Sequence, residues 1–240
     1  MKHIVPAMLV LLALFSACEE QTTERIQLDL GYDFQPLQVG QYREYEVDSI
    51  VYVSDGLRAD TARLFFREEI VEQRLSQAGD TIYVAERYER YQRGDAWQIR
   101  EVFSMRRTPG QFIRTEGNLS FIKLVFPVRA GKRWDGHLFF DANLPITVAS
   151  NTIAVFQNWD YRYKEVNDDV LEVQLADYED NLNIRQATET YQRDIGLIER
   201  TWTVLSTQCG GSATLDCADD PWPVKAERGF VLRQKLIAYN

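Results

Sequence analysis

The feature that most restricts the fold of this chain is an alternation of apolar and polar side chains with a period of two residues. In residues 41–53 (QYREYEVDSIVYV), Tyr45, Val47 and Val51 share one parity, whereas acidic side chains occupy the other. Successive side chains of a β-strand point to opposite faces of a sheet, so this pattern predicts a strand that is buried on one face. Residues 79–91 show the same alternation.

Residues 97–105 (WQIREVFSM) predict another strand, with Trp97, Ile99, Phe103 and Met105 on one face. Strand-forming segments then recur at short intervals, with turn residues between them. They comprise residues 62–75, 111–116, 133–140, 146–150, 159–166, 170–178, 197–205 and 229–239. Many short strands without long helical stretches predict a mainly β domain, built as an antiparallel curved sheet, a partly open barrel or a sandwich.

Two segments are candidates for one or two short helices. Residues 118–127 (NLSFIKLVFP) fit a short helix that begins at the cap residue Asn118 and ends before Pro127. Residues 67–79 (REEIVEQRLSQAG) favour a strand in their first half and leave helix and strand open in their second half. No internal repeat or linker divides the chain, which predicts a single domain over residues 31–240.

The first residues have the composition of a signal peptide. Lys2 precedes an apolar run from Ile4 to Phe15, which is shorter than the roughly 20 residues that a membrane-spanning helix needs. Two small residues and Cys18 follow, and this arrangement resembles the lipobox of bacterial lipoproteins, with phenylalanine where leucine is usual. The resemblance implies removal of residues 1–17 and acylation of Cys18, palmitate included. The alternative is an ordinary secretory signal cleaved nearby, with Cys18 a chance thiol.

The lipobox resemblance also implies a place in the cell. Three acyl chains on one cysteine hold a protein on a membrane without a spanning helix, because each buried methylene contributes about 0.8 kcal/mol. Residues 18–30 are then the lipidated terminus and a flexible polar tether. Glu19 and Glu20 resemble a signal for surface display in some Gram-negative bacteria; alternatively they belong to the solvated tether. We expect the protein in the cell envelope, anchored to the outer membrane on its periplasmic face or at the cell surface.

Three further segments together resemble an abundant group of envelope lipoproteins of Gram-negative bacteria for which no activity is established. They are residues 32–50 (YDFQPLQVGQYREYEVDSI), 123–136 (KLVFPVRAGKRWDG) and 189–202 (ETYQRDIGLIERTW). Members of the group have a Pro-Leu-x-Val-Gly-x-Tyr entry to the first strand and a Gly-Leu-Ile/Val turn between two late strands. The last segment also resembles the curved-sheet carrier fold of the bacterial envelope, in which a half-open antiparallel barrel holds acyl chains.

The charge of the chain argues against one class of partner. Its formal net charge is −9, which becomes −10 when Lys2 leaves with the signal peptide. Proteins bind nucleic acids with basic side chains that neutralise phosphates, so we expect no nucleic-acid partner. The same charge disfavours a protein that lies flat on an anionic membrane surface.

The two remaining cysteines, Cys209 and Cys217, flank a loop rich in glycine, serine and aspartate. In an exported protein this spacing predicts a disulfide bond that closes a surface loop. A metal pair or a redox pair is the alternative, but no other Cys or His lies nearby in the sequence and the CxxC spacing is absent. We therefore predict no metal site and no cofactor.

Catalytic motifs are missing from the sequence. His137 is the only histidine after the predicted signal peptide, and the GxSxG motif is absent, so we expect His137 on the polar side of a strand or beside a turn. Acidic residues between 168 and 180 offer oxygen atoms to calcium, but they lack the EF-hand spacing and are better explained as a solvated loop. We predict no catalytic residues, and the ligand-binding residues stay unassigned.

Aromatic residues are abundant, with five Trp, 12 Tyr and 12 Phe. At a period of two they are typical of the core of a β domain. Binding of a sugar or lipid on an aromatic face is the alternative. Trp222 is the exception, because prolines on both sides of it predict an exposed loop.

Three hypotheses for function follow. The first is a non-enzymatic, lipid-anchored envelope protein that binds a partner protein or a glycan. The second is a carrier whose sheet curls around an acyl chain or another apolar ligand, and it predicts that Phe103, Ile198 and Trp202 face a cavity. The third is a carboxylate-based hydrolase, and it predicts two acids with raised pKa values in one cleft.

Overall fold

A computed structural model describes residues 29–53, 58–77, 79–208, 217 and 219–240. Most of these residues belong to one sheet of 12 strands in which every neighbouring pair is antiparallel. Its strands, in the order in which they lie side by side, are β6 (Leu119–Val125), β5 (Gln111–Glu116), β4 (Gln98–Arg107), β3 (Thr81–Arg90), β2 (Arg58–Leu75), β1 (Tyr42–Val53), β14 (Arg228–Tyr239), β13 (Gly196–Ser206), β12 (Asn183–Gln192), β11 (Val170–Glu179), β10 (Trp159–Val166) and β7 (Arg133–Trp134). The prediction of a mainly β, antiparallel fold is confirmed.

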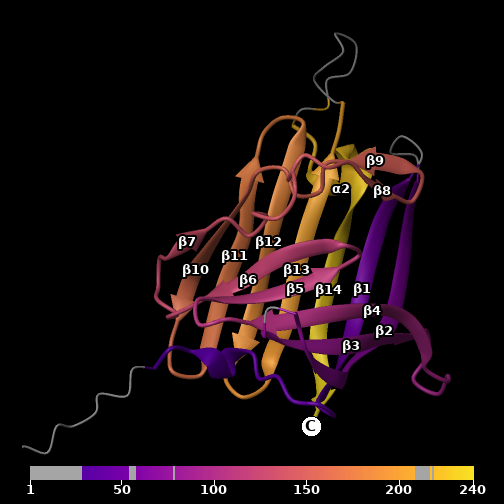
Figure 1. The fold of residues 1–240 in the computed structure, drawn as a ribbon. Helices are drawn as coiled ribbons and strands as arrows, with labels where there is room; N and C mark the ends of the chain where they lie inside the picture. The colour runs from indigo at the N-terminus through magenta and orange to yellow at the C-terminus, as the bar shows by residue number, and fades with distance from the viewer. Residues whose placement is uncertain (1–28, 54–57, 78, 209–216, 218) are drawn as a thin grey trace, which may run out of the picture.

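Four small elements accompany the sheet. The hairpin of β8 (Ile146–Val148) and β9 (Asn151–Ile153) lies near the start of β14 (Figure 1). A 3-10 helix, η2 (Tyr32–Phe34), precedes β1, and a short helix, α2 (Trp222–Lys225), precedes β14. Within the part of the chain that the structure describes, no helix is long and apolar enough to span a membrane.

The sheet is so strongly curved that one half of it lies across the other. Figure 1 shows β5 and β6 crossing in front of β11, β12 and β13. The long strand β2 has a bulge between Ile70 and Glu72, and a bulge of this kind bends a strand. We call the face enclosed by this curvature the inner face. The main hydrophobic core lies on it and joins residues of both halves, among them Phe112, Ile122, Leu124, Tyr161, Leu171, Leu175 and Tyr191.

The two edges of the sheet meet, so the curved sheet is nearly closed. The indole Nε1 of Trp134 donates to the backbone oxygen of Ile122 at 2.8 Å, and the Ile122 nitrogen donates to the backbone oxygen of Gly136 at 3.0 Å. A Cβ atom at Gly136 would come within 2.4 Å of the Tyr161 ring, so only glycine allows this close approach. The result is a partly open barrel, one of the forms that the sequence predicts.

The prediction of a short helix in residues 118–127 is wrong, because residues 119–125 form β6. Gly117 and Asn118 have φ values of 53° and 68°, and they connect the paired residues Glu116 and Leu119. Two successive residues with positive φ are typical of the type I′ turn of a β-hairpin. Asn118 is therefore a turn residue of a hairpin, not a helix cap. Residues 67–75 are strand throughout, as part of β2.

Two smaller predictions are also wrong. Ile99 does not share a face with Phe103: Ile99 is 59% exposed and Phe103 is 3% exposed. Strand β4 has a bulge between Ile99 and Phe103, opposite Arg87 and Tyr88 of β3. The extra residue reverses the alternation, so Ile99 and Phe103 point to opposite faces of the sheet. Trp222 lies in α2 and not in an exposed loop; it is half-buried, and its indole donates to Glu179 Oε1 at 2.7 Å.

Candidate functional site

A pocket of about 420 Å³ opens on the inner face of the sheet, within the range of roughly 300–1,000 Å³ that is typical of small-molecule sites. We call it the apolar pocket, since most of its wall consists of apolar side chains. They are Leu119 and Phe121 of β6, Ile146 and Val148 of β8, Val155 and Phe156 after β9, Trp202 of β13 and Phe230 of β14. Glu101, Arg114, Glu116, Lys123 and Arg200 complete the lining with Gly117.

The alternation of the strands places these side chains together. Arg200 and Trp202 lie two residues apart on β13, so both point to the inner face. Phe121 and Lys123 of β6 also line the pocket, where a register shift at Lys123 interrupts the alternation. Because β6 lies across β13 in the curved sheet, the two pairs converge from opposite sides of the enclosed space. The residues that follow β9 then form a third side of the pocket.

A buried carboxylate holds the two cations that line the base of the pocket. Glu189 is fully buried on β12, and its Oε1 accepts from Lys123 Nζ at 2.6 Å and from Arg200 Nε at 2.8 Å. Tyr191 donates its hydroxyl to the other oxygen at 2.7 Å. Burial acts to raise the pKa of Glu189, but the charges of Lys123 and Arg200 outweigh it and lower the pKa to about 2. Burial lowers the pKa of Lys123 to about 8, although Glu189 opposes this effect.

A second buried network lies beside the first. Arg114 donates to both carboxylate oxygens of Glu68, at 2.7 and 2.8 Å, and Arg87 donates to Glu68 Oε1 at 2.7 Å. Arg87 also donates to Glu116 at 2.9 Å and to Glu101 at 2.8 Å. Burial acts to raise the pKa values of Glu68 and Glu116, but the two arginines outweigh it and lower both, that of Glu116 to about 2. These acids are thus ionised at neutral pH.

The acids at and beside the apolar pocket do not have the raised pKa that acid catalysis by a carboxyl requires. A hydrolase that works with two carboxyls needs one of them protonated, which requires a raised pKa. The pKa values of Glu68, Glu116 and Glu189 are lowered instead, because each carboxylate contacts two cations. The charged groups compensate one another, and the remainder of the wall is apolar.

We expected His137 either on the polar side of a strand or beside a turn, and it is not on a strand. It lies beside a turn, only 5% exposed, and its ring is surrounded by aromatic rings at centroid distances of 5.1 to 6.0 Å. Its Nε2 atom is 3.4 Å from the Tyr161 hydroxyl. Burial lowers the pKa of His137 to about 4, so the ring is neutral at physiological pH. The neighbours are Phe121, Phe140, Phe156, Trp159 and Tyr161.

Of the three residues that the carrier hypothesis places in a cavity, Trp202 alone lines the apolar pocket. Phe103 is packed in the main core, with the guanidinium of Arg114 stacked 3.9 Å from its ring centroid. Ile198 is half-buried and lies outside the pocket. Among the described residues, no group of three or more His, Cys, Asp or Glu side chains is placed to hold a metal ion.

The predicted modification sites fall mostly outside the described residues. Cys18 lies outside them, and so does Cys209. Cys217 is described and Cys209 is not, so the disulfide bond between them stays a prediction.

The sequence contains a signal for the buried charges that our interpretation missed. Glu189 stands between Ala187 and Tyr191 at the parity that faces the core, and Arg200 occupies the same parity as Trp202. A charged residue within the apolar series of a strand is costly unless a partner of opposite charge reaches it. Such residues therefore indicate buried pairs, although the sequence does not show which strand supplies the partner.

Comparisons with known proteins give one structural likeness and no family. No protein-family model and no curated protein matches the chain. One solved structure that is similar to this chain is described as a "putative lipoprotein" from Parabacteroides distasonis. The two share 8% sequence identity with a TM-score of 0.37, over 86% of this chain and 98% of the other. At this level the likeness carries no argument.

Proposed function

We propose that this chain is a non-enzymatic, lipid-anchored protein of the bacterial outer membrane that carries a small apolar or amphipathic ligand in the apolar pocket. The observation that supports the proposal is the pocket itself, since eight apolar side chains line a space of about 420 Å³ on the inner face. The membrane anchor rests on the resemblance of the sequence around Cys18 to a lipobox. Both the periplasmic face and the cell surface suit this function.

The composition of the wall decides the class of ligand. Apolar surface removed from water contributes about 25 cal/mol per Å², so a ligand with a hydrocarbon or ring body gains most from this pocket. The polar atoms at its base, from Lys123 and Arg200, already bond to Glu189. A ligand therefore needs no full charge to enter, but a polar end directed at these side chains would add a hydrogen bond.

A partner protein is the second candidate for what this chain binds. Leu138 and Phe139 are neighbours in the turn after β7, and they are 62% and 50% exposed. Adjacent large apolar side chains on a surface are typical of protein contacts. Neither residue lines the apolar pocket.

Filling the apolar pocket should abolish ligand binding without unfolding the protein. Val148 is half-buried at the edge of the pocket, and a Val148→Trp substitution directs an indole into the space. We expect the variant to bind dansyl-labelled undecanoate at least about tenfold more weakly than the unchanged protein, measured by fluorescence titration. The matched control is Val102→Trp, because Val102 is 55% exposed on β4 and lies outside the pocket. Equal binding by both variants would contradict the proposal.

Removal of the acylated cysteine should release the protein from the membrane. We expect a Cys18→Ser chain in the soluble fraction of fractionated cells, since the segment left after signal cleavage has no apolar run long enough to span a bilayer. Cys209→Ser is the matched control and should stay in the membrane fraction. A Cys18→Ser chain that sediments with membranes after a carbonate wash would refute the anchor. Protease added to intact cells then separates the surface from the periplasmic face.

A further inference from the structure

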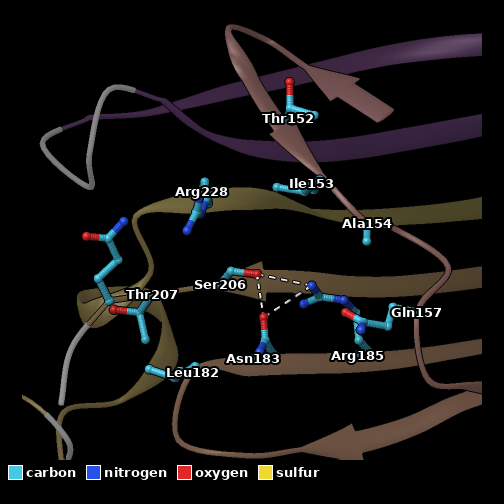
Figure 2. A pocket seen from close by; sticks show the side chains of 11 residues that line it. Thr152, Ile153, Ala154, Gln157, Leu182, Asn183, Arg185, Ser206, Thr207 and Arg228 are labelled. Carbon is cyan, nitrogen blue, oxygen red and sulfur yellow. Dashed lines mark hydrogen bonds between the residues drawn. The ribbon is translucent and has the colours of Figure 1, made fainter. Parts of the chain in front are cut away.

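A second pocket, of about 520 Å³, lies at the end of β12, β13 and β14. Three inner-face residues stand side by side there, because Asn183 pairs with Ser206 and Ser206 pairs with Arg228. Arg185 follows two residues after Asn183 on the same face. Figure 2 shows these side chains together, with Thr152 on the strand that passes over them. We call this space the polar pocket.

Arg185 is buried, and among the described residues no carboxylate contacts its guanidinium. Its side chain is 3% exposed, and its Nη1 donates to the backbone oxygens of Leu205 and Ile184, at 2.6 and 2.9 Å. Its Nη2 donates to Ser206 Oγ at 3.1 Å and Asn183 Oδ1 at 3.4 Å. All four acceptors are uncharged, and the buried Nε atom has no partner.

Arg228 brings a second positive charge to the same pocket. It is half-buried at the start of β14, and its charge acts with burial to lower the pKa of Arg185. Among the described residues, no carboxylate forms an ion pair with either arginine, and none lines the pocket. Asp180, an acid that acts on Arg185 from a distance, accepts instead from the backbone nitrogens of Leu182 and Asn183.

The cations of the apolar pocket are held differently. There each buried cation contacts a carboxylate, as buried charges in proteins generally do. Two arginines that contact no carboxylate among the described residues, in a polar pocket of an acidic protein, are an arrangement that an anionic ligand completes. A guanidinium presents several N–H donors in one plane, and these match the oxygens of a phosphate or a carboxylate.

The remainder of the lining indicates what carries the anionic group. The pocket is far larger than a free phosphate needs, and its wall contains the hydroxyls and amides of Thr152, Gln157, Ser206 and Gln208. Such groups donate to and accept from the hydroxyls of a sugar. We propose that the polar pocket is a binding site for an anionic saccharide, with the phosphate or carboxylate bound by Arg228 and attracted by the charge of Arg185, and the sugar hydroxyls against these neutral side chains.

The test is isothermal titration calorimetry of the full chain in mild detergent, at low ionic strength. The probes are a glucose phosphate, glucuronate, uncharged glucose and inorganic phosphate. We expect at least one of the two anionic sugars to bind at least about tenfold more tightly than both glucose and inorganic phosphate, since charge-assisted hydrogen bonds and sugar contacts act together. Which of the two binds more tightly distinguishes a phosphate site from a carboxylate site. The proposal is overturned if neither anionic sugar binds, or if inorganic phosphate binds as tightly as the sugars.

Variants on one strand show where the anion binds. Arg228→Gln should weaken binding of the anionic sugar at least about tenfold, and Arg228→Lys should restore part of it because the charge returns. The matched control is Arg233→Gln, which removes an exposed arginine from β14 outside the pocket. An equal loss in Arg233→Gln would show general attraction by charge and refute the site. Val148→Trp, which fills the apolar pocket, should leave this binding unchanged, so the carrier proposal and this one fail separately.

Discussion

Replacing Glu189 by glutamine is expected to lower the free energy of unfolding by about 3–5 kcal/mol, which is a large part of the roughly 5–15 kcal/mol that stabilises a typical domain. The carboxylate is fully buried and bonds to Lys123, Arg200 and Tyr191. Glutamine keeps the size of the side chain but leaves two cations, each nearly buried, without a counter-charge. Urea denaturation followed by circular dichroism measures the change.

The control is an ion pair on the surface. Arg63 and Asp48 approach to 2.7 Å, but their side chains are 65% and 50% exposed. Because solvent screens such a pair, Asp48→Asn should change the free energy of unfolding by only about 0–1 kcal/mol. A similar small loss in Glu189→Gln would mean that water reaches Lys123 and Arg200, and that the buried network does not stabilise the fold.

Removal of all three charges distinguishes two causes of the loss. Buried ion pairs often contribute little net stability, since desolvation of the charges offsets their attraction. A chain with Lys123→Met, Glu189→Met and Arg200→Met should therefore be more stable than Glu189→Gln alone. The stability recovered by the triple variant measures how much of the single loss comes from the unpaired cations, and the rest comes from lost packing and from the bond to Tyr191.

Local pattern was enough to predict the strands, and it failed where a turn or a bulge intervened. The alternation around Tyr45 predicted β1, and the series from Leu197 to Leu205 predicted most of β13. Gly117 and Asn118 form a hairpin turn in which both residues have positive φ. The apolar residues that follow them led to the prediction of a helix instead. The bulge in β4 moved Ile99 to the surface for a similar local reason.

The apolar pocket was beyond reach of the sequence because it depends on long-range contacts. Lys123 and Glu189 are 66 residues apart, and they meet only because the sheet folds β6 across β12. That curvature depends on the bulge in β2 and on the close approach of Gly136 to Tyr161. Of the residues that the carrier hypothesis placed at a cavity, Trp202 lines the apolar pocket, and its parity on β13 is local information.

The buried His137 should make the protein less stable as the pH falls from about 6.5 to about 4. Burial lowers the pKa of the folded protein's imidazole to about 4, whereas the unfolded chain has a value of about 6.5. Below about pH 6.5 the unfolded chain therefore binds a proton that the folded chain does not bind, and this difference favours unfolding. A difference of about 2.5 pKa units corresponds to about 3 kcal/mol, lost over this range and constant below it.

The surroundings of the ring support this sign. Five aromatic rings enclose it and exclude water; Asp135 raises its pKa, and Lys123 lowers it in the same direction as burial does. The only other histidine, His3, lies within the predicted signal peptide. Between about pH 6.5 and about pH 5, before most carboxyls take up protons, His137 should then account for most of the fall in stability.

A comparison with His137→Phe isolates the effect. Phenylalanine keeps an aromatic ring among the same neighbours but has no titratable group, so its free energy of unfolding should lack this part of the pH dependence. Urea denaturation gives the free energy of unfolding of both proteins at about pH 8 and about pH 4. The value for the protein with His137, relative to that for His137→Phe, should be about 3 kcal/mol higher at about pH 8 than at about pH 4. A constant difference between the two proteins would show that His137 takes up its proton in the folded state near its ordinary pKa. Because a charged ring beside Phe121 and Lys123 requires water there, that result would also mean that the aromatic cluster beside the apolar pocket opens to solvent.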